Sequence, residues 1–95
     1  MKVRYRARAL ADIDEINDYL QERSPTGARN VLASIHVTIR SIAEQPYASE
    51  RTDHSDIRVK FVRRYRYKIF YSILDEDAVE IIHVRHTSRR PWEGT

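Results

Sequence analysis

The chain has 95 residues, which is enough for one domain with one modest hydrophobic core and leaves no room for a second. It contains no cysteine, so disulfides and thiolate metal sites are excluded, which suits a reducing cytosol. The net charge of +3 is unevenly distributed: residues 57–95 carry nine Lys/Arg and five Asp/Glu, and residues 1–56 carry eight and nine. No apolar run approaches a membrane span or the core of a signal peptide, so we expect a soluble, cytoplasmic protein.

Residues 2–6 alternate charged side chains with Val3 and Tyr5, which predicts a short strand. A helix is expected next, because apolar residues then recur at steps of three and four: Leu10, Ile13, Ile16 or Asn17, and Leu20. The pattern places four acidic residues on the outer face of this helix: Asp12, Asp14, Glu15 and Asp18.

Ser24-Pro25 predicts the start of a second helix, because a serine hydroxyl caps well and proline fits the first helical position. Its core stripe is expected to be Ala28, Val31, Leu32, Ile35, Ile39, Ile42 and Ala43. Pro46 ends the helix, and residues 46–56 are expected to form a surface loop. The short connection between the two helices predicts an antiparallel hairpin whose apolar seam needs a sheet to cover it.

Residues 65–74 and 78–86 alternate with a period of two around Asp75-Glu76-Asp77, which predicts an antiparallel β-hairpin. With Glu76 and Asp77 at the tip, the expected pairs are Leu74–Val79, Tyr71–Ile82, Ile69–Val84 and Lys68–Arg85. The face turned to the core would then carry Tyr67, Ile69, Tyr71, Ile82 and Val84. The opposite face would carry Arg66, Lys68, Phe70, His83 and Arg85.

Residues 57–62 also alternate, and they add Ile57, Val59 and Phe61 to the core face if Arg63 to Tyr65 form the connection. That register gathers four basic residues on the other face: Arg58, Lys60, Lys68 and Arg85. Neighbouring like charges do not stabilise a sheet, so the cluster indicates a polyanionic or acidic partner, although a merely solvated face is the alternative. The tyrosines that alternate with isoleucines are expected in the core rather than as base-stacking platforms.

We therefore expect an α+β fold: an N-terminal strand and an antiparallel helical hairpin packed on a three- to four-stranded antiparallel β-sheet. Residues 1–95 form one domain in this interpretation. With no cysteine and no HExxH, we expect no metal site and no cofactor.

Three segments carry a family resemblance: "ALADIDEINDYL", "TIRSIAEQP" and "YRYKIFYSILDEDAVEIIHVRHTSRRPWE". Together with the initial strand they resemble the RelE/ParE superfamily of type II toxin-antitoxin toxins over nearly the whole chain. The tail "VRHTSRR" is most similar to the ParE branch of plasmid-stabilisation toxins. The resemblance implies poisoning of DNA gyrase, growth inhibition and a cognate ParD-like or RelB-like antitoxin that folds around the toxin. The sequence departs from the family pattern at one position: many relatives have a glycine a few residues after the proline that closes the second helix, and this chain has Ser49 there.

The RelE branch, whose members are ribosome-dependent mRNA endonucleases, is the alternative that the resemblance leaves open. Cutting RNA needs a deprotonated 2′-hydroxyl, charge stabilisation and an acid for the leaving oxygen. RelE-like enzymes supply these from a basic sheet face, matched here by Arg58, Lys60 and Lys68, and from a C-terminal tyrosine. The expected basic position falls on Ser88 and the expected tyrosine falls near Gly94, which favours a non-catalytic gyrase inhibitor. A third alternative is an inactive member that only binds.

The candidate residues divide into two surfaces. Target binding is assigned to Arg58, Lys60, Lys68, Arg85, His86, Arg89, Arg90 and Trp92. If the protein is an endonuclease, the catalytic candidates are Arg58, Lys60, Lys68, Arg85 and His86. Antitoxin binding is assigned to Tyr19 and Arg40. His86 has a purely structural alternative as a strand-end histidine, and the basic tail has one as a segment without a contact.

Overall fold

The computed structural model describes residues 1–54 and 56–87. In chain order its elements are β1 (Lys2–Tyr5), α1 (Ala7–Gln21), α2 (Pro25–Glu44), β2 (Glu50–Arg51), β3 (Arg58–Phe61), β4 (Tyr67–Ile73) and β5 (Ala78–His86). The strands form one sheet in the order β1-β5-β4-β3-β2. β1 runs parallel to β5, and the other neighbouring strands are antiparallel. The predicted α+β fold is confirmed, with five strands rather than three or four.

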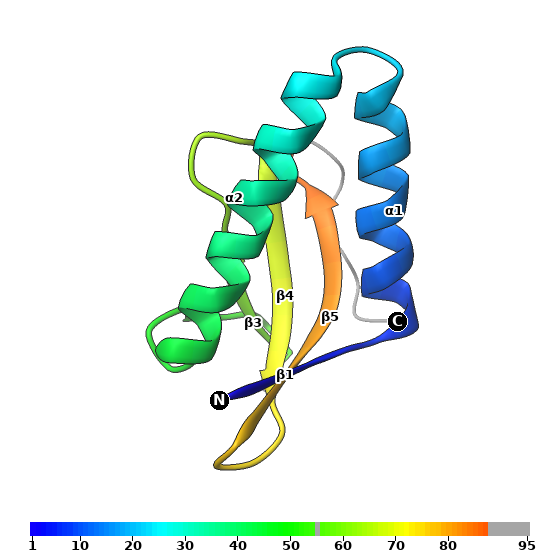
Figure 1. Cartoon of the computed structure of the whole chain (residues 1–95). Coiled ribbons are helices and arrows are strands. Elements are labelled where there is room, and N and C mark those ends of the chain that lie inside the picture. The colour runs from blue at the N-terminus through cyan, green and yellow to red at the C-terminus, as the bar shows by residue number, and fades with distance from the viewer. Residues whose placement is uncertain (55, 88–95) are drawn as a thin grey trace.

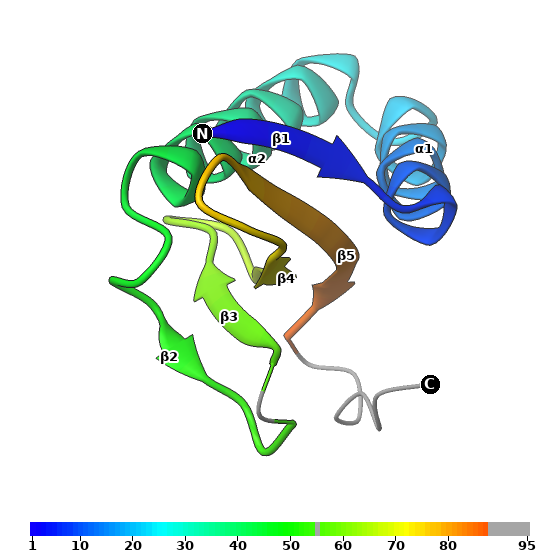
Figure 2. The ribbon, with the colours of Figure 1, turned by 90° about the horizontal axis from the view of Figure 1, so that it is seen from below.

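The two helices form the predicted antiparallel hairpin and cover one side of the sheet (Figure 1). Seen along the sheet, α2 crosses its face and α1 lies beside β5 and β1 (Figure 2). The core between the layers consists of Ala9, Val31, Ile35, Ile39, Ile42, Val62, Ile69, Tyr71, Val79, Ile81 and Val84. Neither described helix is long and apolar enough to cross a membrane.

The second helix begins where the sequence predicts, because the Ser24 hydroxyl accepts a hydrogen bond from the Gly27 amide at 3.0 Å and Pro25 occupies the first turn. The predicted core stripe is largely confirmed: Ala28, Val31, Ile35, Ile39 and Ile42 are buried. The helix ends at Glu44, just before Pro46. Residues 46–56 are not entirely a loop, since β2 pairs with β3 inside this segment.

The predicted register between β3 and β4 is wrong by one residue. Val59 lies opposite Phe70, and Lys60 lies opposite Ile69. The Val62 amide donates to the Tyr67 carbonyl at 2.9 Å, so four residues rather than three form the connection. Because side chains alternate along a strand, this single step moves every β3 side chain to the other face of the sheet.

A β-bulge interrupts the pairing of β4 with β5. Phe70 lies opposite His83 but Tyr71 lies opposite Ile81, so Ile82 is the additional residue. The predicted Ile69–Val84 and Lys68–Arg85 pairs are confirmed, whereas the predicted Tyr71–Ile82 and Leu74–Val79 pairs are wrong. The additional residue shifts by one position which side chains of β5 face the helices. Val79 and Ile81 before the bulge and Val84 after it therefore all belong to the core.

Candidate functional site

The predicted basic cluster is divided between the two faces of the sheet. Lys68 and Arg85 are direct partners across β4 and β5, as predicted. Residues opposite one another on antiparallel strands project from the same face, so the register puts Lys60 with Ile69 and Arg58 with Tyr71. Ile69 and Tyr71 belong to the core under the helices. Arg58 and Lys60 therefore project from the helix-covered face, and Lys68 and Arg85 from the other.

Arg58 has a structural role that the sequence did not indicate. Its guanidinium donates to the Ser49 carbonyl at 2.8 Å and to the Tyr47 carbonyl at 3.4 Å. The guanidinium carbon also lies 5.2 Å from the centre of the Tyr47 ring, within the range of a cation–π contact. Arg58 thus holds the segment between α2 and β2 against β3.

The face away from the helices is partly apolar. Phe70 and His83, which are paired across β4 and β5, are both buried, and their rings stack with centres 6.2 Å apart. The Lys68 ammonium lies 5.5 Å from the Phe70 ring centre. Phe61, opposite Lys68, is 59% exposed. The positive charges of this face therefore stand beside aromatic rings.

The remaining residues predicted for target binding either lie on the other face of the sheet or fall outside the described residues. His86 is paired with Tyr67 and meets its ring edge-on, at 5.3 Å between centres, on the helix-covered side. Arg89, Arg90 and Trp92 lie outside the described residues. Within residues 1–54 and 56–87, no group of three His, Asp or Glu side chains could hold a metal ion.

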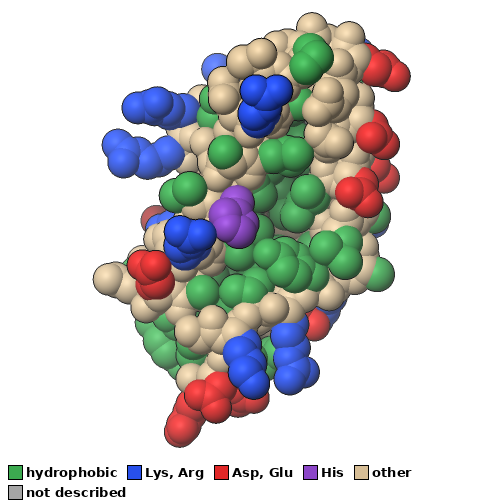
Figure 3. Space-filling model, in the orientation of Figure 1, with side chains coloured by type: hydrophobic (Ala, Val, Ile, Leu, Met, Phe, Trp, Pro, Cys, Tyr) green, Lys and Arg blue, Asp and Glu red, His purple; other side chains and the backbone are tan. Residues whose placement is uncertain are grey.

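Tyr19 and Arg40, the residues assigned to antitoxin binding, are exposed on different helices. Tyr19 on α1 is 56% exposed, and the Arg23 guanidinium stacks 3.6 Å from its ring centre. Arg40 on α2 lies 3.5 Å from the His36 ring, nitrogen to nitrogen. Apolar surface is visible between the two helices in Figure 3, and the helices contribute half-buried Ile13, Ile16, Leu20 and Leu32 to the core margin.

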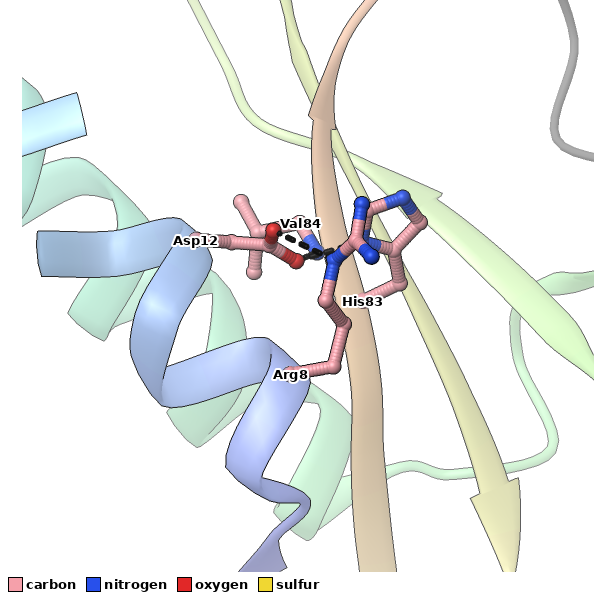
Figure 4. A network of polar contacts seen from close by, with 4 residues as sticks. All are labelled: Arg8, Asp12, His83 and Val84. Carbon is pink, nitrogen blue, oxygen red and sulfur yellow. Dashed lines mark hydrogen bonds and ion pairs between the residues drawn. The ribbon is translucent and has the colours of Figure 1, made fainter. Parts of the chain in front are cut away.

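A buried polar network joins α1 to β5. Asp12 Oδ2 accepts a hydrogen bond from the Val84 amide at 2.9 Å and another from His83 Nδ1 (Figure 4). Asp12 Oδ1 accepts from Arg8 Nε at 3.0 Å, one helical turn away. Asp12 and His83 are only 6% and 5% exposed. The placement of Asp12 on the outer face of the helix was therefore wrong.

The geometry of the sheet explains why a carboxylate is buried there. β1 pairs with β5 only as far as Ile81, so the amide of Val84 has no strand partner on that side. Asp12 supplies the missing acceptor, and buried backbone amides are almost always paired. The sequence signal was its position: Asp12 lies three residues after buried Ala9 and four before Ile16, within the apolar stripe.

Burial lowers the pKa of His83 below its usual 6.5, because the protonated ring loses hydration. The hydrogen bond and the charge of Asp12 oppose this shift, whereas the charges of Arg8 and Arg85 add to it. Since a carboxylate only accepts, the neutral ring donates from Nδ1 to Asp12.

The lowered pKa predicts a loss of stability in acid. The unfolded chain takes up a proton on this histidine near pH 6.5, before the folded chain does, so the free energy of unfolding should fall as the pH drops below 6.5. Urea denaturation between neutral and mildly acidic pH measures this. The decrease should be smaller in His83→Gln and unchanged in His36→Gln, whose histidine is exposed. Equal pH profiles for both variants would contradict the assignment.

With the geometry in place, comparison with known proteins decides the family. The family model described as "ParE toxin of type II toxin-antitoxin system, parDE" matches residues 3–91. The chain belongs to this ParE toxin family. This confirms the resemblance to the RelE/ParE superfamily.

One curated relative and two solved structures are similar to this chain over most of its length. The Sinorhizobium fredii protein named "Putative toxin Y4kP" is 29% identical over 89 residues, covering 94% of this chain and 91% of the relative. The chromosomal ParDE toxin-antitoxin system from P. aeruginosa matches with a TM-score of 0.80 at 15% identity, covering 93% of this chain and 97% of that chain. The intact E. coli RelBE toxin-antitoxin complex matches with a TM-score of 0.63 at 19% identity, covering 92% and 96%. At these identities the two structures show the shared fold.

Proposed function

We propose that this ParE family member inhibits growth by poisoning DNA gyrase in the cytoplasm, without cutting RNA. The observation that carries the proposal is the division of the basic residues. An RNA-cleaving site needs several charged groups converging on one phosphate. Of the three basic strand positions matched to RelE-like enzymes, only Lys68 projects from the same face as Arg85, and Arg58 is bonded to loop carbonyls. This arrangement favours binding over catalysis.

The target-binding surface in this proposal is centred on Lys68 and Arg85 and continues in sequence toward Arg89, Arg90 and Trp92. Charged residues at the edge of an interface raise the rate of association with an oppositely charged target. Loss of one such charge therefore weakens the complex without unfolding the protein. Arg58 and Lys60 are given a smaller role, because they project from the other face.

Two assays on the purified protein test this function together. The wild type should inhibit gyrase supercoiling, and primer extension should show no codon-positioned cuts in mRNA on translating ribosomes. Arg85→Ala should weaken gyrase inhibition about tenfold, equivalent to about 1.4 kcal/mol of binding, with little change in melting temperature. Arg29→Ala, which removes an exposed arginine from α2, is the matched control and should keep full inhibition.

Other results would select another function. Codon-positioned cuts that disappear in Lys68→Ala would establish the RelE-like endonuclease instead. Absence of both gyrase inhibition and RNA cleavage would leave a member that only binds. Inhibition that persists undiminished in Arg85→Ala would remove this face of the sheet from the target surface.

We further propose that a cognate antitoxin covers the apolar surface between α1 and α2. The similar ParDE and RelBE structures are of toxin-antitoxin systems, which supports such a partner. The two helices carry exposed charges of opposite sign: Asp14, Glu15 and Asp18 on α1, and Arg29 and Arg40 on α2. An amphipathic antitoxin segment with complementary flanking charges would suit such a surface.

Tyr19→Ala and Arg40→Ala should therefore weaken the complex with the antitoxin. Tyrosine and arginine are the residue types that most often dominate an interface, and loss of about 2 kcal/mol at such a position lowers affinity roughly thirtyfold. Calorimetric titration of each variant with the product of the neighbouring gene measures the effect. Arg51→Ala, an exposed change on β2, is the control. A complex that tolerates both helix variants uses a different surface.

A further inference from the structure

The connection between β3 and β4 carries three exposed arginines, Arg63, Arg64 and Arg66, which lie outside the proposed target-binding and antitoxin-binding residues. The ion pairs among the described residues involve Arg6, Arg8 and His83, and none involves an arginine of this connection. Figure 3 shows Lys and Arg side chains projecting at its left edge, where Figure 1 draws the connection beside the start of β4. Among residues 1–54 and 56–87, no carboxylate forms an ion pair with these arginines.

The backbone of this connection holds an arginine in a conformation that folding alone does not favour. Arg64 has φ 72°, the only positive φ of a non-glycine residue in the described part of the chain. Glycine adopts this left-handed region readily, whereas a long side chain is disfavoured there. A disfavoured residue kept at an exposed turn points to a role for its side chain.

The arginines continue the positive region of the sheet face. The Arg66 carbonyl accepts a hydrogen bond from the Thr87 amide at 2.7 Å, which places the connection next to the end of β5. Lys68 follows Arg66 by two residues and is paired with Arg85. The result is a run of positive charge from the turn onto the sheet, beside the exposed ring of Phe61.

We propose that Arg63, Arg64 and Arg66, the arginine turn, bind the phosphate backbone of duplex DNA. Guanidinium groups recognise phosphates through paired hydrogen bonds. Several guanidiniums without intervening carboxylates suit a ligand with closely repeated negative charge, and duplex DNA carries one charge per roughly 1.7 Å of its axis. The inference goes beyond the proposed function, because it assigns a direct nucleic-acid contact whether or not gyrase is the target.

Fluorescence anisotropy with a short labelled DNA duplex of arbitrary sequence tests the arginine turn. The full chain should bind in low salt, with an affinity that falls as salt rises. In the triple variant Arg63→Ala/Arg64→Ala/Arg66→Ala, affinity should drop at least tenfold, and the slope of log K against log salt should shrink by about 0.9 for each lost phosphate contact. The control Lys2→Ala/Arg29→Ala/Arg51→Ala removes the same charge from other exposed positions and should keep most of the affinity.

A single variant separates the role of the side chain from that of the turn. Arg64→Gly relieves the positive φ, so its melting temperature should stay equal or rise while DNA affinity falls. The inference is overturned if the wild type does not bind the duplex, or if both triple variants bind it equally. It is also overturned if a single-stranded RNA of the same sequence binds through the turn and the duplex does not.

These outcomes are distinguishable from those of the gyrase assay. A protein that binds DNA through the arginine turn but leaves gyrase active would disprove the proposed function and keep this inference. A protein that inhibits gyrase without any affinity for DNA would do the reverse.

Discussion

Asp12→Ala is expected to destabilise the protein by about 2 to 4 kcal/mol, because it leaves two buried donors, the Val84 amide and His83 Nδ1, without an acceptor. For a domain of this size that corresponds to a fall in melting temperature of roughly 10 to 30 °C. The loss of Arg8 as a partner should add little, since that side chain is largely exposed. Urea denaturation and thermal melting at neutral pH measure the effect.

Asp14→Ala is the matched control, since it removes a carboxylate from the same helix at an exposed position. Its effect should stay within about 0.5 kcal/mol, as is usual for such surface changes. Asp12→Asn should fall between the two, because its amide oxygen can still accept from one of the buried donors. If Asp12→Ala were as stable as Asp14→Ala, the network between α1 and β5 would not hold the fold together.

Ile69→Ala is the second change with a large expected effect, about 2 to 5 kcal/mol. Ile69 is fully buried in the centre of β4, between Lys60 of β3 and Val84 of β5, and its side chain faces the helices. Truncation removes apolar contacts and leaves a cavity that close-packed neighbours cannot fill completely. Growth inhibition should then be lost in step with the folded fraction, which denaturation curves and growth assays measure together.

Val37→Ala provides the comparison, since Val37 is 63% exposed on α2 and should tolerate the change. Arg85→Ala provides another, since activity should fall there without loss of stability. A variant Ile69→Ala that unfolded like the wild type would place Ile69 outside the core.

Local sequence patterns predicted the helices and the β-hairpin, but they did not predict the register between β3 and β4, which decides which face of the sheet each β3 side chain occupies. The cap at Ser24, the stripe of α2 and the Lys68–Arg85 pair depend on residues close in sequence; the cap and the pair are confirmed, and the stripe is largely confirmed. The β3 register depends on one residue in the connecting turn, and an arginine at positive φ gives no signal of the kind that glycine or asparagine gives. That one residue decided whether Arg58 and Lys60 would join the basic face.

The bulge and the buried carboxylate escaped prediction for different reasons. Adjacent Ile81 and Ile82 interrupt a simple alternation and could have indicated an extra residue in β5. Asp12 lies among apolar helix positions. Its carboxylate is needed only because β1 ends at Tyr5, which leaves the Val84 amide without an acceptor from a neighbouring strand. Whether the Val84 amide lacks a strand partner depends on how the whole sheet assembles, so it cannot be predicted from a local stretch of sequence.

The carboxylate of Asp12 also limits how the sheet could grow. Exposed strand edges are templates on which further strands, from a partner or from another copy, can pair. On one side β1 covers the first part of β5, and beyond it Asp12 occupies the Val84 amide. The two edge strands of the sheet are short: β1 has four residues and β2 has two. A further strand therefore finds no free amide at Val84 and only short templates at β1 and β2, which limits edge-to-edge aggregation.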